Sequence, residues 1–197
     1  MVSARISSNP SACSSSPGDS PLIGIDPGLQ RTGYAVVRPR GCEAELIEAG
    51  VVRLGAGLPL EARLAELERG LDELISATQP GCLVCEELYA HYRHPRTAIL
   101  MAHARGVVLA LAARRGLEVC GVAATQVKKL LTGSGRAGKA QMQRAITAAL
   151  HLDRPPEPHD VSDAIAIALC GQRLRAARRR LASAAPIGGT GPNGRPA

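Results

Sequence analysis

Residues 21–34 read PLIGIDPGLQRTGY, and this stretch decides the fold. Its apolar start is typical of a buried strand, and Asp26-Pro-Gly28 is a turn signal. A second strand is predicted over 33–38 (GYAVVR) and a third over 45–53 (ELIEAGVVR), with a turn at 39–41 between them. We therefore expect a β-meander whose first strand ends in an acidic side chain.

Helical and strand patterns alternate after the meander. Apolar residues at helical spacing predict a helix over 60–77, and a nearly all-apolar centre predicts a buried helix over 97–114. We expect an α/β fold, with a five-stranded mixed sheet and helices on both faces. The remaining expected elements are strands at 82–86 and 117–122, helices at 126–131 and 139–150 around a flexible loop at 132–138, and a last helix over about 160–183.

Length and composition predict one domain of residues 21–183 with two disordered tails. Residues 1–20 are rich in Ser and Pro, and residues 184–197 are rich in Gly and Pro. No stretch resembles a secretory signal, and the longest apolar run, 107–113, is far below the roughly 20 residues that span a bilayer. We expect a cytoplasmic protein with no membrane partner.

The motif Cys82-Leu-Val-Cys85 matches the spacing of some zinc and redox sites. It lies within a predicted strand, where residues three apart point to opposite faces. The two sulfur atoms would diverge, which predicts buried apolar thiols rather than a metal or redox pair. The sequence also has no GxxxxGK[ST] or GxSxG motif, so a P-loop NTPase and a serine hydrolase have no support.

Charge is distributed unevenly along the chain. The formal net charge is +7, but residues 21–87 carry six basic and eleven acidic side chains. Residues 88–150 carry ten basic side chains and one acid, Glu118. A strongly basic segment next to an acidic one indicates an anionic partner, and nucleic acid is the first candidate.

Four acidic positions stand at the ends of predicted elements: Asp26 ends the first strand, Glu86 or Glu87 ends the fourth, and Asp160 and Asp163 begin the last helix. Carboxylates placed together repel one another. A Mg²⁺ ion that binds their oxygen atoms offsets this repulsion. Two such ions can stabilise the attacking and the leaving oxygen of an in-line phosphoryl displacement. The acids thus predict metal-dependent phosphoester chemistry. His159 leaves several interpretations open: general base, metal ligand, helix cap or solvated side chain.

At these residues the sequence resembles the RuvC crossover-junction endodeoxyribonucleases, the Holliday junction resolvases. The resemblance runs in family order over about residues 21–170, and the motifs are specific when taken together. The matching stretches are Ile23–Gly28 with Thr32–Tyr34, Glu86–Tyr89, Ala104–Gly106, Gln126–Lys128, Gly138–Gln141 and Asp160–Ala168.

The resemblance implies a ribonuclease-H-like fold, a homodimer, and paired Mg²⁺-dependent nicking of four-way DNA junctions in recombination and repair. Two Mg²⁺ ions per site are expected, with Mn²⁺ as a substitute, and the products carry 5′-phosphate ends. A branch-migration motor complex is implied as a partner. The implied catalytic and metal-binding residues are Asp26, Glu86, Asp160 and Asp163, and the implied DNA contacts are Tyr89, Arg105, Lys128 and Lys139.

The segment after the aromatic position, Ala90–Arg96, departs from the family pattern, which puts the junction contacts there in question. Three alternatives to a resolvase stay open. One is an RNA-processing nuclease of the same fold, and another is one half of an actin- or sugar-kinase-like ATPase. The third is a junction-binding protein without catalysis.

Overall fold

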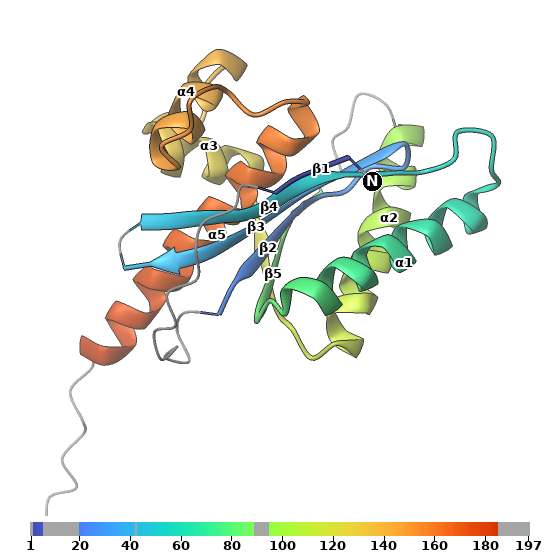
Figure 1. Ribbon diagram of the computed structural model, residues 1–197, viewed down its shortest axis with the longest axis horizontal. Helices are drawn as coiled ribbons and strands as arrows, with labels where there is room; N and C mark the ends of the chain where they lie inside the picture. The colour runs from blue at the N-terminus through green and yellow to red at the C-terminus, as the bar shows by residue number, and fades with distance from the viewer. Residues whose placement is uncertain (1, 6–19, 42, 89–94, 185–197) are drawn as a thin grey trace, which may run out of the picture.

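The computed structural model describes residues 2–5, 20–41, 43–88 and 95–184. A mixed sheet in the order β1-β4-β3-β2-β5-β6 lies at the centre of the molecule (Figure 1). The strands are β1 (Val2–Arg5), β2 (Leu22–Asp26), β3 (Arg31–Arg40), β4 (Glu43–Arg53), β5 (Cys82–Glu86) and β6 (Glu118–Val122). The helices are α1 (Leu60–Thr78), α2 (Pro95–Arg114), α3 (Ala124–Thr132), α4 (Lys139–Ala149) and α5 (His159–Ala184).

The pairing of the strands confirms the predicted mixed sheet. β2 pairs antiparallel with β3, whereas β2 with β5 and β5 with β6 are parallel pairs. Because β2 and β5 run in the same direction, their carboxyl ends meet at one edge of the sheet. Asp26 and Glu86 are the last residues of these two strands, so the topology alone places both acids at that edge.

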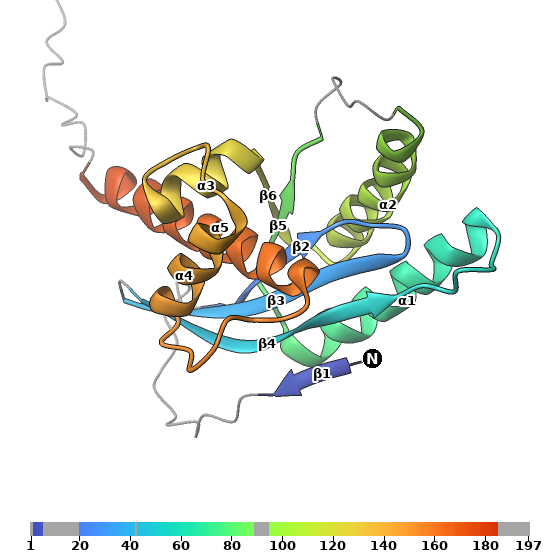
Figure 2. The same ribbon diagram turned by 90° about the horizontal axis from the view of Figure 1, so that it is seen from above.

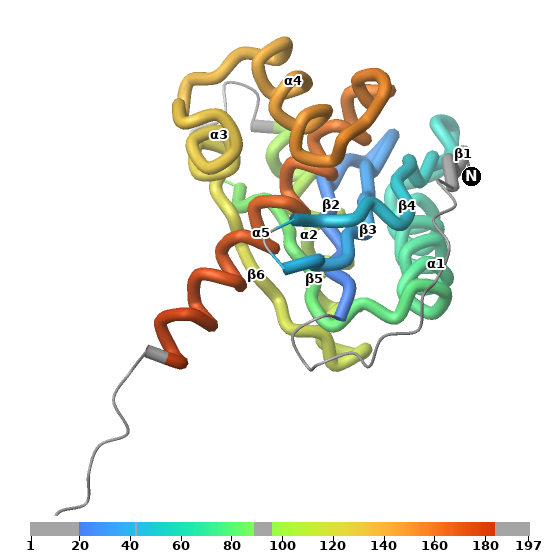
Figure 3. The backbone as a smooth tube through the Cα atoms, turned by 60° about the vertical axis from the view of Figure 1, so that its left-hand side comes forward, coloured from blue at the N-terminus to red at the C-terminus, as the bar shows by residue number. Residues whose placement is uncertain are grey.

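Helices cover both faces of the sheet, as Figures 2 and 3 show. α5 packs on one face with α3 and α4 beside it, and α1 and α2 pack together on the other face. Each face has its own apolar cluster because successive strand residues point to opposite sides. Cys82 lies in the cluster under α5 and Cys85 in the cluster under α1 and α2, which confirms that the two thiols diverge. Burial raises the pKa of each to about 12.

Two glycines allow α5 to lie directly against the sheet. A Cβ atom on Gly24 of β2 would come within 2.5 Å of the Ala164 carbonyl oxygen and the Ala168 nitrogen. A Cβ atom on Gly33 of β3 would come within 2.0 Å of the Asp160 carbonyl oxygen. Side chains at these positions would push the helix away, so the glycines set the distance between the acids of α5 and the end of β2.

The structure differs from the expected architecture at the amino terminus. Composition predicts disorder over residues 1–20 and a sheet of five strands, but Val2–Arg5 forms a sixth strand. This strand pairs antiparallel with β4, with Val2 opposite Val51 and Arg5 opposite Glu48. Main-chain hydrogen bonding to an edge strand needs no apolar pattern, which explains why no local signal marks it. The tail at 185–197 lies outside the described residues.

α2 contains the one segment among the described residues, Arg96–Arg114, that is long and apolar enough to cross a membrane by length and composition. Its inner side packs in the cluster shared with α1, through Ala104, Val108 and Leu111. Arg105 in the middle of the helix donates a hydrogen bond to the end of β5. These contacts are those of a helix that belongs to the core, with an apolar outer side that remains exposed.

Candidate active site

The structure brings the four predicted acids to one end of the sheet. Asp26 stands at the end of β2 and Glu86 at the end of β5, side by side on parallel strands. Asp160 lies in the first turn of α5 and Asp163 in the second, and the helix start reaches this edge because its backbone lies against Gly33. The two aspartates are one helical turn apart and therefore share a face of α5.

The charges of these side chains act on one another. Burial, together with the negative charges of Asp163, Glu86 and Asp160, raises the pKa of Asp26 to about 7. Partial burial and the charge of Asp163 also raise the pKa of Glu86. Partial burial is again the main cause of the raised pKa of Asp163, and the charge of Asp160 adds to it. The raised pKa values of Asp26, Glu86 and Asp163 indicate a site with excess negative charge.

This donor set fits a hard divalent cation, because Mg²⁺ takes carboxylate oxygens and its charge relieves the repulsion among them. The residues are of the right kind and lie on three adjacent elements. Among the described residues, however, no three His, Cys, Asp or Glu side chains are already gathered in metal-binding geometry. The fit therefore rests on the chemistry of the carboxylates and on their mutual effect on pKa.

The turn after Asp26 is held by internal hydrogen bonds. The buried Thr32 hydroxyl donates to the Gly28 carbonyl oxygen at 2.7 Å and accepts from the Gly28 amide at 3.2 Å. Arg63 of α1 donates to the Leu29 carbonyl oxygen. These bonds close the loop between β2 and β3, so Asp26 emerges from a fixed backbone.

Two predicted DNA contacts lie beside the acids. The positive charge of Lys128, on α3, lowers the pKa of both Glu86 and Asp163, in opposition to burial. Lys139, the first residue of α4, is exposed and acts on Asp163 in the same direction. His159, the first residue of α5, also lowers the pKa of Asp163 through its charge. Both lysines therefore stand where a phosphate bound at the carboxylates would meet a positive charge.

Arg105 is half-buried, and its Nε donates to the main-chain oxygen of Glu86 at 3.0 Å. This contact fixes the end of β5, a positioning role that the sequence analysis did not foresee. Its predicted DNA contact stays a prediction. Tyr89 and most of the atypical segment 90–96 lie outside the described residues.

The structure separates the two adjacent glutamates. Glu86 is the partly buried acid that faces Asp163, whereas Glu87 is exposed and lies over β6, where its carboxylate would meet a Cβ atom added to Gly121. The sequence motif alone leaves either residue possible. The geometry favours Glu86 as the member of the acidic site.

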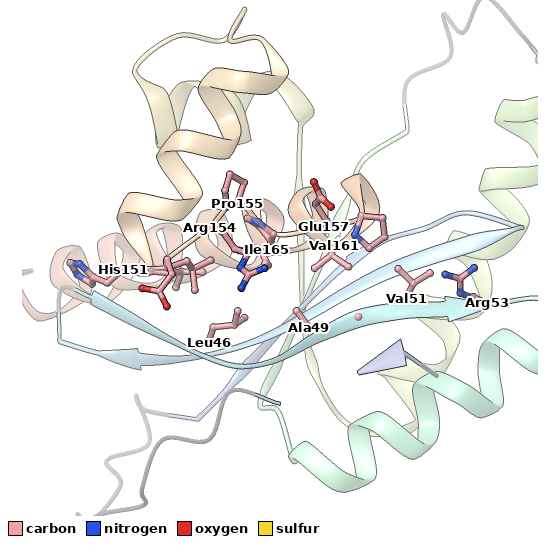
Figure 4. A pocket seen from close by; sticks show the side chains of 16 residues that line it. Leu46, Ala49, Val51, Arg53, His151, Arg154, Pro155, Glu157, Val161 and Ile165 are labelled. Atoms are coloured by element: carbon pink, nitrogen blue, oxygen red, sulfur yellow. The ribbon is translucent and has the colours of Figure 1, made fainter. Parts of the chain in front are cut away.

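A hollow lies next to this site. It has a volume of about 880 Å³ and opens between β4 and the loop that precedes α5 (Figure 4). Its floor is apolar, with Leu46, Ala49 and Ile165, and its rim carries Arg53 and Arg154. None of the four acids lines it.

Comparison with known proteins agrees with this arrangement. The family model for crossover junction endodeoxyribonuclease RuvC matches residues 22–171. The chain belongs to the RuvC family. The family member of Rhodopirellula baltica is 47% identical over 153 residues, which is 78% of this chain and 86% of that protein. The member from Frankia casuarinae is 41% identical over 170 residues, covering 86% and 98% of the two chains.

Comparison with solved structures also finds Holliday junction resolvases. T. thermophilus RuvC in complex with Holliday junction substrate superposes with a TM-score of 0.75 and 30% identity, over 80% of this chain and 96% of that one. The yeast mitochondrial Holliday junction resolvase shares the fold, with a TM-score of 0.60 at 16% identity. The ribonuclease-H-like fold is confirmed, and the RNA-processing, ATPase and non-catalytic alternatives are not favoured.

One neighbour of this RuvC-family site was missed in the sequence. Arg31, at the start of β3, lies 4.0 Å from the Asp160 carboxylate and is half exposed. Nothing in the local pattern distinguishes Arg31 from other arginines, because its proximity to Asp160 depends on the docking of α5.

Proposed function

We propose that this chain resolves four-way DNA junctions by paired, Mg²⁺-dependent nicks. The observation that carries the proposal is the group of four carboxylates at the joined ends of β2, β5 and α5, with two lysines acting on it. A basic surface next to an acidic metal site suits a polyanionic substrate. Membership of the RuvC family supports the choice of a junction over linear DNA.

In this proposal Asp26 and Glu86 hold one Mg²⁺, and Asp26 with Asp160 and Asp163 holds a second, with Mn²⁺ as a substitute. When bound, the ions supply positive charge that activates water and stabilises the leaving oxygen. Asp26 would contribute to both sites, which agrees with the effect of the other three acids on its pKa.

The chain's own residues orient the substrate. Lys128 and Lys139 contact DNA phosphates near the carboxylates, and Lys139 stabilises the negative charge that develops at the scissile phosphate. Tyr89 stacks on a junction base and Arg105 contributes to DNA binding while it holds Glu86. The products carry 5′-phosphate and 3′-hydroxyl ends.

Replacing Lys128 with Ala should weaken junction binding and flatten its dependence on salt. A lysine that neutralises one phosphate contributes about 0.9 to the slope of log affinity against log salt, and its loss costs on the order of tenfold in affinity at 0.1 M salt. Fluorescence anisotropy with a labelled junction measures the affinity and its dependence on salt. Ca²⁺ or EDTA in the buffer prevents cutting.

Arg69→Ala is the matched control, because Arg69 is exposed on α1, on the other face of the sheet. It should leave the slope unchanged. An unchanged slope in Lys128→Ala as well would show that Lys128 makes no phosphate contact.

The proposal includes a homodimer, because symmetric nicks in two strands require two active sites. The outer side of α2 is suited to this role. Five exposed residues with small or apolar side chains recur at helical spacing along it. They form the outer stripe of α2: Ile99, Ala102, Gly106, Ala110 and Ala113. Ile99 is the largest of these side chains and is 58% exposed, so it would bury apolar surface in a dimer.

Replacing Ala110 with Arg should separate the dimer into monomers. A charge buried in a helix–helix contact raises the dissociation constant by roughly a hundredfold. Light scattering coupled to gel filtration measures the mass, and junction cutting should change from paired nicks to single nicks. Ala65→Arg, at an exposed alanine on α1, should remain dimeric. A dimeric Ala110→Arg protein would place the interface elsewhere.

We also propose that the protein acts in the cytoplasm together with a branch-migration motor. The branch-migration motor is supported by the resemblance to the RuvC family.

A further inference from the structure

The carboxyl-terminal part of α5 carries a dense group of arginines that the active site does not use. Residues 171–184 contain five arginines and no acidic residue. Only the first residue of this segment falls within the 22–171 match to the family model. Figures 1 and 3 show that this end of the helix extends past the strands, away from α4. We call this group the distal arginines: Arg173, Arg175, Arg178, Arg179 and Arg180.

Positive charge dominates the surface that these side chains form. Arg175 pairs with Glu118, with 2.9 Å between Nε and Oε2. Arg173 donates to the Leu130 carbonyl oxygen at 2.7 Å, which is an uncharged acceptor. Four of the five are exposed along the helix, and the segment that carries them has no acid of its own. The segment therefore carries an excess of positive charge.

One donor in the group is buried and lacks an acceptor. Nη1 of Arg175 is shielded from solvent, and among the described residues it has no hydrogen-bond partner. Arg175 and Arg179 line a hollow of about 110 Å³ between α5 and the turn after β3. A buried guanidinium nitrogen without a partner is costly unless an acceptor reaches it, and a phosphate oxygen is such an acceptor.

Basic side chains of α3, together with Arg173, lie between the active site and the distal arginines. Lys128 acts on Glu86 and Asp163, Lys129 is exposed next to it on α3, and the end of α3 is bonded to Arg173. With a rise of about 1.5 Å per residue, Arg178 lies roughly 22 Å along α5 from Asp163. At about 3.4 Å per base pair, this distance corresponds to about six or seven base pairs of duplex.

We propose that the distal arginines are a second phosphate-binding surface, which holds the duplex of a junction arm about six or seven base pairs from the scissile phosphate. This inference rests on the proposed function, since it assumes that a junction is bound at the carboxylates. The surface contacts the phosphate backbone of the DNA and not the base edges. It therefore adds affinity and orients the arm without sequence preference.

Arm length provides the test. Two junctions are compared, with arms of about 5 and about 16 base pairs, each closed by a hairpin loop so that the short arms stay paired. For the wild type we expect tighter binding and a steeper salt dependence with the long arms. In the double variant Arg178→Gln/Arg179→Gln the preference for long arms should disappear, with affinity for the long-armed junction lower by nearly a hundredfold at 0.1 M salt and the salt slope reduced by about 2. Binding of the short-armed junction should not change.

Three controls make the result specific. Arg178→Lys/Arg179→Lys keeps the charge and should restore most of the long-arm advantage. The variant Arg69→Gln/Arg114→Gln removes two charges from the face of α1 and α2. It should keep the full preference for long arms. Equal melting temperatures would show that the Gln variant is folded.

A Gln variant that still prefers long arms would overturn the proposal, and the arginines would then serve a different, acidic partner. Equal weakening with both arm lengths would also overturn it. Cleavage of the short-armed junction by the wild type tests the proposed function separately, because that substrate does not reach the distal arginines.

Discussion

Replacing Asp26 with Asn should abolish junction cleavage while junction binding is largely retained. Asp26 is the acid on which the other three act, and in the proposed site it is the ligand shared by both ions. Loss of a shared ligand removes about 4 kcal/mol or more of transition-state stabilisation, which is roughly a thousandfold in rate. Single-turnover cleavage of a labelled junction in Mg²⁺ measures the rate, and anisotropy measures binding.

The same substitution should stabilise the metal-free protein at alkaline pH. The pKa of Asp26 is about 7 in the folded state and 3.8 in the unfolded chain, so the folded state binds the proton more tightly. Stability therefore falls as pH rises from about 4 to about 8, by up to about 4 kcal/mol from this group. The amide of the Asp26→Asn variant cannot ionise, so this variant should lose less stability over the same range in EDTA.

The exposed Asp153→Asn is the control for both measurements, because Asp153 lies on the loop before α5 and outside the acidic group. It should cut normally and show the pH dependence of the wild type. An Asp26→Asn protein that cuts at a normal rate would disprove the site assignment.

Replacing Gly33 with Ala should damage both stability and cleavage, although Gly33 carries no functional group. The new Cβ atom would lie 2.0 Å from the main-chain oxygen of Asp160, and a backbone atom cannot rotate away as a side chain can. The first turn of α5 must shift, and Asp160 and Asp163 shift with it. We expect a loss of about 3 kcal/mol in the free energy of unfolding and a large loss of cleavage.

Chemical denaturation and the cleavage assay measure the two effects. Gly57→Ala is the matched control, since a Cβ atom there meets nothing within 4 Å. If Gly33→Ala unfolded and cut like the wild type, the close seating of α5 on β3 would be wrong.

Local patterns predicted most of the fold. The meander and the alternating helices and strands follow from apolar periodicity and from Pro and Gly turns, and the structure places them within a few residues of the expected bounds. The acids at the ends of β2 and β5 could be foreseen because a parallel pair brings those ends together. Glu86 was distinguished from Glu87 by the resemblance to the family, and the geometry agrees.

Features that depend on docking could not be predicted. β1 is defined by main-chain pairing with β4, and its four residues are too few for a local pattern to predict a strand. The contacts of Arg31 with Asp160 and of Arg105 with the Glu86 carbonyl join residues that only the packing of α5 and α2 brings together. The close approach of α5 at Gly24 and Gly33 is also a property of the assembled layers.

The most direct test of the central claim compares a mobile four-way junction with a linear duplex of matched sequence. Purified full-length protein is incubated with each, in Mg²⁺ and in EDTA, and the products are resolved on denaturing gels. The account predicts symmetric nicks in the junction, only in Mg²⁺, with 5′-phosphate ends and no cutting of the duplex. Junction binding without cleavage in Mg²⁺ or Mn²⁺, or equal cutting of both substrates, would contradict it.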